Sequence, residues 1–140
     1  MAAEVAIRRE QGAPLPPDVA FLSGEVPLGS LEWAVREAGR LRVCAHEILL
    51  GQRLIDTEAY YRALAASIGA RFAPLVHFRF PADPFAGRDP VVAARLGMLM
   101  IASGSRTEIA SAPRGAQVTA LVESIRTRPA AAERIVITTP

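Results

Sequence analysis

Few residues of this chain have the types and spacing that chemistry requires. The 140 residues include two histidines, His46 and His77, and one cysteine, Cys44. Cys44 and His46 stand two apart in a segment with helical spacing, so we expect them on different sides of a helix, not as a nucleophile and its base. Glu47 follows His46 directly and shares no helix face with it. Paired cysteines and His-Glu-x-x-His are absent, so the sequence predicts neither a catalytic residue nor a metal site.

Other chemical motifs are missing as well, with one turn as an exception. The sequence contains no Gly-x-Ser-x-Gly, Walker A or Gly-x-Gly-x-x-Gly pattern. Asp83 and Asp89 lie too far apart, in too irregular a segment, for a metal-dependent transferase site. Pro113-Arg114-Gly115 precedes a predicted helix, whose first N–H groups could hold a phosphate or carboxylate together with Arg114. An ordinary strand-to-helix connection explains the same residues.

Composition excludes several classes of protein. The chain is 51% hydrophobic and 21% charged, which is typical of a folded domain. No apolar run reaches the ~18 residues of a membrane helix, no secretory signal is visible, and one cysteine cannot form an internal disulfide. The net charge of +2 does not support a nucleic-acid surface. Every basic residue is arginine, which reflects coding bias or anion recognition. We expect a cytoplasmic domain with no direct membrane insertion.

Four short helices are predicted in the first half, after a flexible tail over residues 1–14. Apolar residues at helical spacing mark the helices at about 15–22, 27–38, 44–52 and 56–68. Gly39 stands where the second helix should end, and Gly69 where the fourth should end. Asp56 is the expected N-cap of the fourth helix. Residues 15–69 are therefore predicted to form a helical block of two helix pairs.

The second half is predicted to be a small β-β-α-β unit over residues 96–140. It consists of strands at 96–102 and 106–112, a helix after Gly115 and a strand at 135–138. Residues 70–95 connect the two halves, and their prolines and phenylalanines (Phe72, Phe78, Phe80 and Phe85) indicate irregular or edge-strand material. The expected fold class is therefore α+β. Because the chain stops directly after a strand, we expect it to be part of a longer protein.

The helical block contains an internal repeat with an offset of 29 residues. Gly24, Leu31 and Val35 in the first helix pair correspond to Arg53, Tyr60 and Leu64 in the second, and Ala20 corresponds to Leu49. A helix pair cannot bury its own apolar stripe, so two stacked pairs are a plausible unit. A plain helical bundle accounts for the same apolar positions.

At these residues the sequence resembles a known family. Residues 47–50 and 54–65 (Leu-Ile-Asp-Thr-Glu-Ala-Tyr-Tyr-Arg-Ala-Leu-Ala) look like the N-terminal domain of type II secretion and type IV pilus assembly ATPases, also called MshEN. Residues 58–65, 112–116 and 137–140 resemble more closely the version that precedes bacterial family 2 glycosyltransferases of exopolysaccharide synthesis. The resemblance covers about residues 16–140.

That resemblance implies cyclic di-GMP binding through two tandem motifs, here residues 15–38 and 44–67. The spacing fits, but the chemistry departs from the family pattern. The Arg-Leu-Gly openings of the family are replaced here by Leu15-Pro16-Pro17 and Cys44-Ala45-His46. The closing glutamines are replaced by Ala38 and Ser67. The mid-motif glycine is kept as Gly24 and replaced by Arg53. The positions that would bind the ligand are Gly24, Leu31, Val35, Leu49, Tyr60 and Leu64, with Arg40, Arg42 and Arg53 as substitute charges.

The expected function is a non-catalytic regulatory or docking domain of a bacterial membrane glycosyltransferase for exopolysaccharide synthesis. Its partner would be the rest of that parent protein, which tethers it to the inner membrane, or another protein. It would need no cofactor, and its cyclic di-GMP motifs are degenerate. Two alternatives stay open, namely a functional cyclic di-GMP sensor and an adaptor domain of a secretion or pilus ATPase. The docking hypothesis predicts exposed apolar surface on the helical block.

Overall fold

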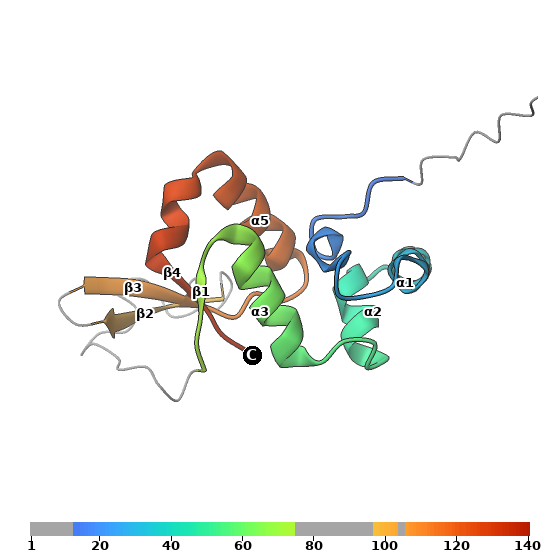
Figure 1. Ribbon diagram of the computed structural model, residues 1–140, viewed down its shortest axis with the longest axis horizontal. Coiled ribbons are helices and arrows are strands. Elements are labelled where there is room, and N and C mark those ends of the chain that lie inside the picture. Colours follow the sequence, from blue (N-terminus) through green and yellow to red (C-terminus); the bar gives the residue numbers. More distant parts are fainter. Residues whose placement is uncertain (1–12, 75–96, 104–105) are drawn as a thin grey trace, which may run out of the picture.

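A four-stranded sheet with helices beside it makes up the computed structural model of the chain (Figure 1). The structure describes residues 13–74, 97–103 and 106–140. The expected tail lies outside this part up to residue 12, as do residues 75–95 of the expected connecting segment. Those 21 positions include His77, Phe78, Phe80, Asp83, Phe85 and Asp89.

Three α-helices follow one another in the first half. They are α1 (Leu28–Leu41), α2 (Ala45–Gly51) and α3 (Thr57–Ile68), preceded by a 3-10 turn, η1 (Ala20–Leu22). The first helix predicted from the sequence is therefore only this turn. Two prolines precede it, and its backbone bonds are short-range, such as Leu22 N–H to Val19 O at 2.9 Å.

The helix ends are partly those that the sequence predicted. Asp56 is the N-cap of α3, since its carboxylate accepts hydrogen bonds from Glu58 and Ala59 N–H, and Gly69 ends α3 with φ of 74°. The prediction that α1 ends at Gly39 is wrong. The helix continues to Leu41, and Arg42 takes the left-handed cap with φ of 58°. A glycine inside a helix lowers helix stability by only about 1 kcal/mol relative to alanine, which is too little to end α1 at Gly39.

A mixed sheet with strand order β1-β4-β3-β2 makes up most of the second half. Its strands are β1 (Arg71–Phe72), β2 (Met98–Ser103), β3 (Arg106–Ser111) and β4 (Ile135–Ile137), with α5 (Ala116–Thr127) and a 3-10 turn, η3 (Pro129–Arg134), between β3 and β4. β2 and β3 pair antiparallel, whereas β4 runs parallel to β3 and β1. The order β2, β3, α5, β4 matches the expected β-β-α-β unit, and the fold class α+β is confirmed.

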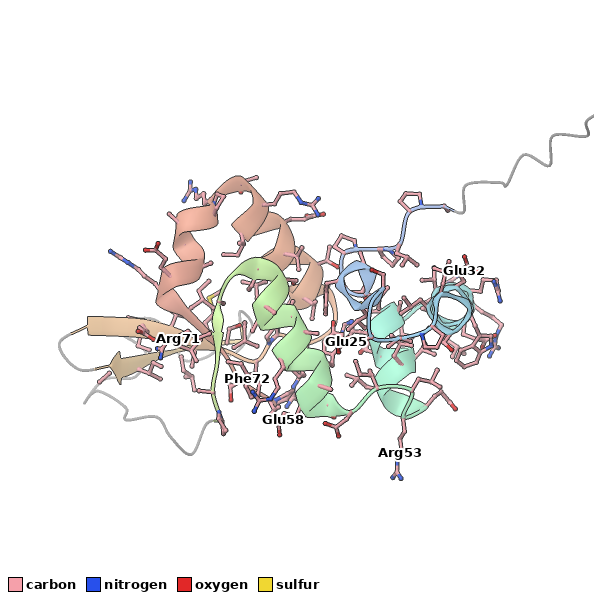
Figure 2. All side chains as sticks on the ribbon, in the orientation of Figure 1. Glu25, Glu32, Arg53, Glu58, Arg71 and Phe72 are labelled. Atoms are coloured by element: carbon pink, nitrogen blue, oxygen red, sulfur yellow. The ribbon has the colours of Figure 1, made fainter. Side chains whose placement is uncertain are left out.

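β1 adds an edge strand from the segment that was predicted to connect the two halves. Arg71 pairs with Val136 of β4, and its guanidinium forms an ion pair with Glu108 of β3. The Arg62 guanidinium of α3 lies over the Phe72 ring, 4.5 Å from the ring centroid. Figure 2 labels Phe72 beside α3. The sequence indicated irregular or edge-strand material here, and the structure contains the edge strand.

One hydrophobic core runs through both halves. The larger core cluster joins residues of α1, α2, α3 and α5 to Ile135 and Ile137, whereas Val136 belongs to a separate cluster with Ile101 and Ala110. Since successive strand residues face opposite sides, the helices cover the face that carries Ile135 and Ile137. Figure 1 shows α3 between the sheet and the α1–α2 end of the molecule. Within the described residues, no helix has both the length and the apolar character needed to cross a bilayer.

Candidate functional site

The apolar residues that the family resemblance assigns to ligand binding lie in the core. Leu31, Leu49, Tyr60 and Leu64 are each 0% exposed. Val35 is half-buried and packs against the same cluster. A guanine base cannot stack on side chains that are enclosed by their own fold, so packing explains the spacing of these residues without a ligand.

The charged residues of that set lie at the surface, at the end of α1 and in the turn between α2 and α3. Arg40 is held by Glu37 in an ion pair of 2.8 Å. Arg42 caps α1, and Arg53 occupies the turn between α2 and α3 with φ of 55°. Figure 2 shows the Arg53 side chain pointing away from the body of the protein. Gly24 is exposed after η1, and none of these residues lines the hollows described below.

A buried pair, Asp18 and His46, is the polar centre of the helical block. Asp18 Oδ2 lies 2.8 Å from His46 Nδ1 and accepts the His46 backbone N–H at 3.0 Å. The two residues are only 3% and 2% exposed. The Tyr60 ring stacks on the imidazole at 5.3 Å, and its hydroxyl donates to the Asp18 carbonyl oxygen at 2.7 Å. This network ties the segment before η1 to α2 and α3.

The ionisation of this centre follows from its hydrogen bonds. Burial alone would raise the pKa of Asp18, but the hydrogen bonds and charge of His46 outweigh it and hold that pKa below its ordinary value. The carboxylate is therefore ionised at neutral pH, and Nδ1 carries the proton that it accepts. Burial, reinforced by the Asp18 charge, raises the pKa of Tyr60 far above its ordinary value, so its hydroxyl stays a donor.

Cys44 lies closer to this pair than the sequence predicted. It is the N-cap of α2, where its Sγ accepts the Glu47 N–H while the Glu47 carboxylate accepts the Cys44 N–H at 2.7 Å. Sγ, a His46 ring nitrogen and an Asp18 oxygen lie within 4.8 Å of one another. The prediction that a spacing of two separates Cys44 from His46 is wrong, because a cap residue does not follow helical geometry. Burial, with Glu47 and Asp18, raises the pKa of the thiol, whereas a nucleophilic cysteine needs a lowered one.

The same three side chains are a poor fit to a metal ion. Two atoms bound to one tetrahedral zinc ion lie about 3.4 Å apart, because each bond is about 2.1 Å long. His46 Nδ1 and Asp18 Oδ2 are 2.8 Å apart, the distance of a direct hydrogen bond. The geometry of this cluster is that of an oriented imidazole beside a capping thiol.

A hollow of about 380 Å³ lies next to this centre, where α2, α3 and the turn before α5 meet. We call it the His46 hollow; its lining residues are His46, Glu47, Leu50, Thr57, Tyr61, Arg114, Gly115 and Pro140. It contains Arg114 and Gly115, the two residues of the predicted anion site, and joins them to α2. Tyr61 fixes this arrangement, since its hydroxyl donates to the Pro113 carbonyl oxygen at 2.7 Å.

A second surface feature lies on α1 and the turn between α2 and α3. A groove of about 330 Å³, which we call the Trp33 groove, is lined by Gly29, Ser30, Trp33, Gln52 and Leu54. Trp33 is 38% exposed and Leu54 is 43% exposed. The other large apolar side chains that are exposed in the described part of the chain are Leu28, Leu41 and Val43. All of them belong to the helical block.

Comparison with protein-family models and with curated proteins finds no match for this chain. The resemblance described above therefore stays a prediction. Sequence reasoning missed the Asp18–His46 pair, because its members stand 28 residues apart and carry no local motif. It also missed Tyr61 as a link to Pro113. The only signal in the sequence was the presence of polar residues inside apolar helical stripes.

Proposed function

We propose that this chain is a non-catalytic regulatory or docking domain that binds a partner protein through the Trp33 groove. The observation that carries the proposal is the placement of exposed large apolar side chains, all of which, within the described residues, lie on the helical block. Contiguous exposed apolar surface with a polar rim is characteristic of protein interaction sites. The small residues Gly29 and Ser30 leave room for an inserted side chain.

The charges around the groove define the chemistry of the partner. Arg53 adjoins Leu54, and Arg36 lies one helical turn after Trp33 on the same side of α1. Arg53 and Arg36 are exposed, and neither forms an ion pair within the described residues. Glu37 also lies one turn after Trp33, but its carboxylate is paired with Arg40. An apolar side chain flanked by acidic residues fits this surface. Following the family resemblance, we propose the cytoplasmic part of a bacterial family 2 glycosyltransferase as the partner, with this chain tethered to the inner membrane through it.

Cyclic di-GMP sensing is the second candidate function. Arg42 and Arg53 favour it, because both are exposed cations without an ion pair in the described part of the chain. The burial of Leu31, Leu49, Tyr60 and Leu64 counts against it, since a cyclic dinucleotide would find few stacking surfaces. Docking is therefore the function that the geometry supports better.

A matched pair of variants tests the docking proposal. The affinity of the chain for the cytoplasmic part of the glycosyltransferase from the same genome is measured by calorimetry. Trp33→Ser with Leu54→Ser is expected to weaken binding about tenfold or more, because buried aromatic anchors dominate interfaces. Leu41→Ser with Val43→Ser removes equally exposed apolar surface outside the groove and is expected to change affinity less than about twofold. Equal losses in both variants, or no binding by the wild type, would overturn the proposal.

The coding sequence that follows codon 140 distinguishes a parent glycosyltransferase from a parent secretion or pilus ATPase. Membrane spans together with Asp-x-Asp in the same reading frame support the glycosyltransferase. A Walker A motif there supports the alternative of an adaptor domain in a secretion or pilus ATPase and would overturn the proposed partner.

A further inference from the structure

We propose that the His46 hollow binds a small phosphorylated polyol, such as a sugar phosphate, with the phosphoryl group on the turn before α5 and hydroxyl groups on α2. The proposal does not depend on the docking function, because the hollow and the Trp33 groove share no residue.

Hydrogen-bond donors gather on one wall of the hollow. α5 is a 12-residue helix whose N-cap is Gly115. The N–H groups of Gly115 and Ala116 form no hydrogen bond with any described residue, whereas Gln117 and Val118 N–H bond to Arg114 O and Gly115 O. The Arg114 guanidinium has no carboxylate partner in the described part of the chain. Of these groups, Gly115 and Arg114 line the hollow, and a free N–H at a helix N-terminus together with a cation suits a phosphoryl group.

The backbone of Gly115 contributes to this wall. Its φ of 53° and ψ of −132° lie in a region that side chains with a Cβ rarely adopt. No atom of the described residues lies within 4 Å of a Cβ placed there, so space does not explain the glycine. The conformation itself does.

His46 gives an independent indication of a ligand. The residue exposes only 2% of its surface and lines the hollow. Nδ1 is held by Asp18, and no described residue bonds to Nε2. Among the described residues, the buried side-chain atoms that lack both a partner and solvent contact are Ser111 Oγ and Thr138 Oγ1. Nε2 is not among them, so it keeps some solvent contact. Nε2 is therefore the ring nitrogen that is left for a ligand.

The acceptor atoms in the lining of the hollow decide what kind of ligand fits. Glu47 and Thr57 line the hollow together with Arg114 and offer acceptor oxygens. A bare anion would face the Glu47 carboxylate, which is unfavourable. Hydroxyl groups on the ligand supply the donors that these acceptors need. Leu50 and Tyr61 add an apolar wall, and the volume of about 380 Å³ lies within the range of small-ligand sites.

Calorimetry on the purified chain tests the site with three probes: glucose 6-phosphate, glucose and inorganic phosphate. We expect glucose 6-phosphate to bind about tenfold more tightly than glucose or inorganic phosphate. It alone engages both the donors at Arg114 and Gly115 and the acceptor oxygens of Glu47 and Thr57. Arg114→Gln is expected to weaken its binding about tenfold, which is the typical effect of losing a charge-assisted hydrogen bond. The matched control is Arg126→Gln, which removes the same charge from the last turn of α5, outside the hollow, and should leave the affinity unchanged.

A second readout follows His46 directly. The ¹⁵N resonance of Nε2 should shift on addition of glucose 6-phosphate, and the same shift in the Arg114→Gln chain should need about tenfold more ligand. No binding at about 10 mM glucose 6-phosphate would overturn the proposal, since even fragments bind sites of this kind in the millimolar range. Equal affinity for inorganic phosphate would overturn the polyol class, and equal losses in the Arg114 and Arg126 variants would overturn the location.

Discussion

Asp18 and His46, 28 residues apart in the chain, are joined by two hydrogen bonds to one carboxylate oxygen inside the helical block. The bonds come from the imidazole and from the backbone of His46, so the pair fixes both a side chain and the start of α2. Because both residues are buried, the loss of either partner leaves polar groups without water or protein to bond to.

Asp18→Asn is therefore expected to lower the free energy of unfolding by about 2–3 kcal/mol at pH 7. Urea unfolding measures the change. Asp56→Asn is the matched control, because Asp56 is an exposed N-cap and asparagine caps equally well, so its cost should stay below about 0.5 kcal/mol. If the two variants are equally stable, the Asp18–His46 pair does not carry the stability assigned to it.

The same pair predicts how stability depends on pH. The pKa of Asp18 is lower in the folded chain than its ordinary value, so the unfolded chain takes up a proton first as the pH falls. The contribution of Asp18 is complete above about pH 5 and is lost as the pH falls below about 3.9 and through the folded pKa. The wild type should therefore lose more stability between pH 5 and pH 3 than Asp18→Asn does.

How far the sequence predicted the fold depended on where the determining contacts lie. Local signals placed Asp56, Gly69 and the helix after Gly115 correctly, because capping and periodicity act within a few residues. The same signals misplaced the end of α1 at Gly39, since nothing local shows that the helix continues to Leu41.

Contacts between residues far apart in the chain could not be predicted from local sequence patterns. β1 contains two residues, too few for a strand periodicity, and it pairs with β4 more than sixty positions later. The His46 hollow combines Arg114 and Gly115, which the sequence singled out, with His46, which it did not. The connection depends on the bond between Tyr61 and Pro113, 52 residues apart.

Cys44 is predicted to be a slow nucleophile. Burial and the carboxylates of Glu47 and Asp18 raise the pKa of its thiol, so less thiolate is present at pH 8 than in a free cysteine. Alkylation by iodoacetamide should therefore be slower than that of glutathione at the same pH. Glu47→Gln keeps the capping hydrogen bond but removes a charge, and should speed the reaction several-fold. A rate equal to that of glutathione would contradict the raised pKa.

Thr138→Val is predicted to stabilise the chain. Thr138 is 3% exposed, and its Oγ1 has no hydrogen-bond partner in the described structure. Valine has the same shape without the polar atom, so the exchange removes a desolvation cost of about 1 kcal/mol. The melting temperature should rise by about 3 °C for a chain of this size. A fall in melting temperature would show that the hydroxyl has a partner, such as a bound water.

Cyclic di-GMP is expected to produce no binding heat at high micromolar concentration. The apolar positions of the tandem motifs, including Tyr60 and Leu64, are enclosed in the core and offer no stacking surface. Isothermal titration with the purified chain measures this. Saturable binding that disappears in Arg42→Ala with Arg53→Ala would favour the sensor function over docking.

Site-specific photo-crosslinking in cells tests the docking function most directly, because it reports the contact itself. A photoreactive phenylalanine analogue replaces Leu54 in the Trp33 groove or, as the control, Val43, which is equally exposed outside it. The account predicts a crosslink from position 54 to a family 2 glycosyltransferase, identified by mass spectrometry, and none from position 43. Equal crosslinking at both positions, or no crosslink from position 54 to the glycosyltransferase, would contradict it.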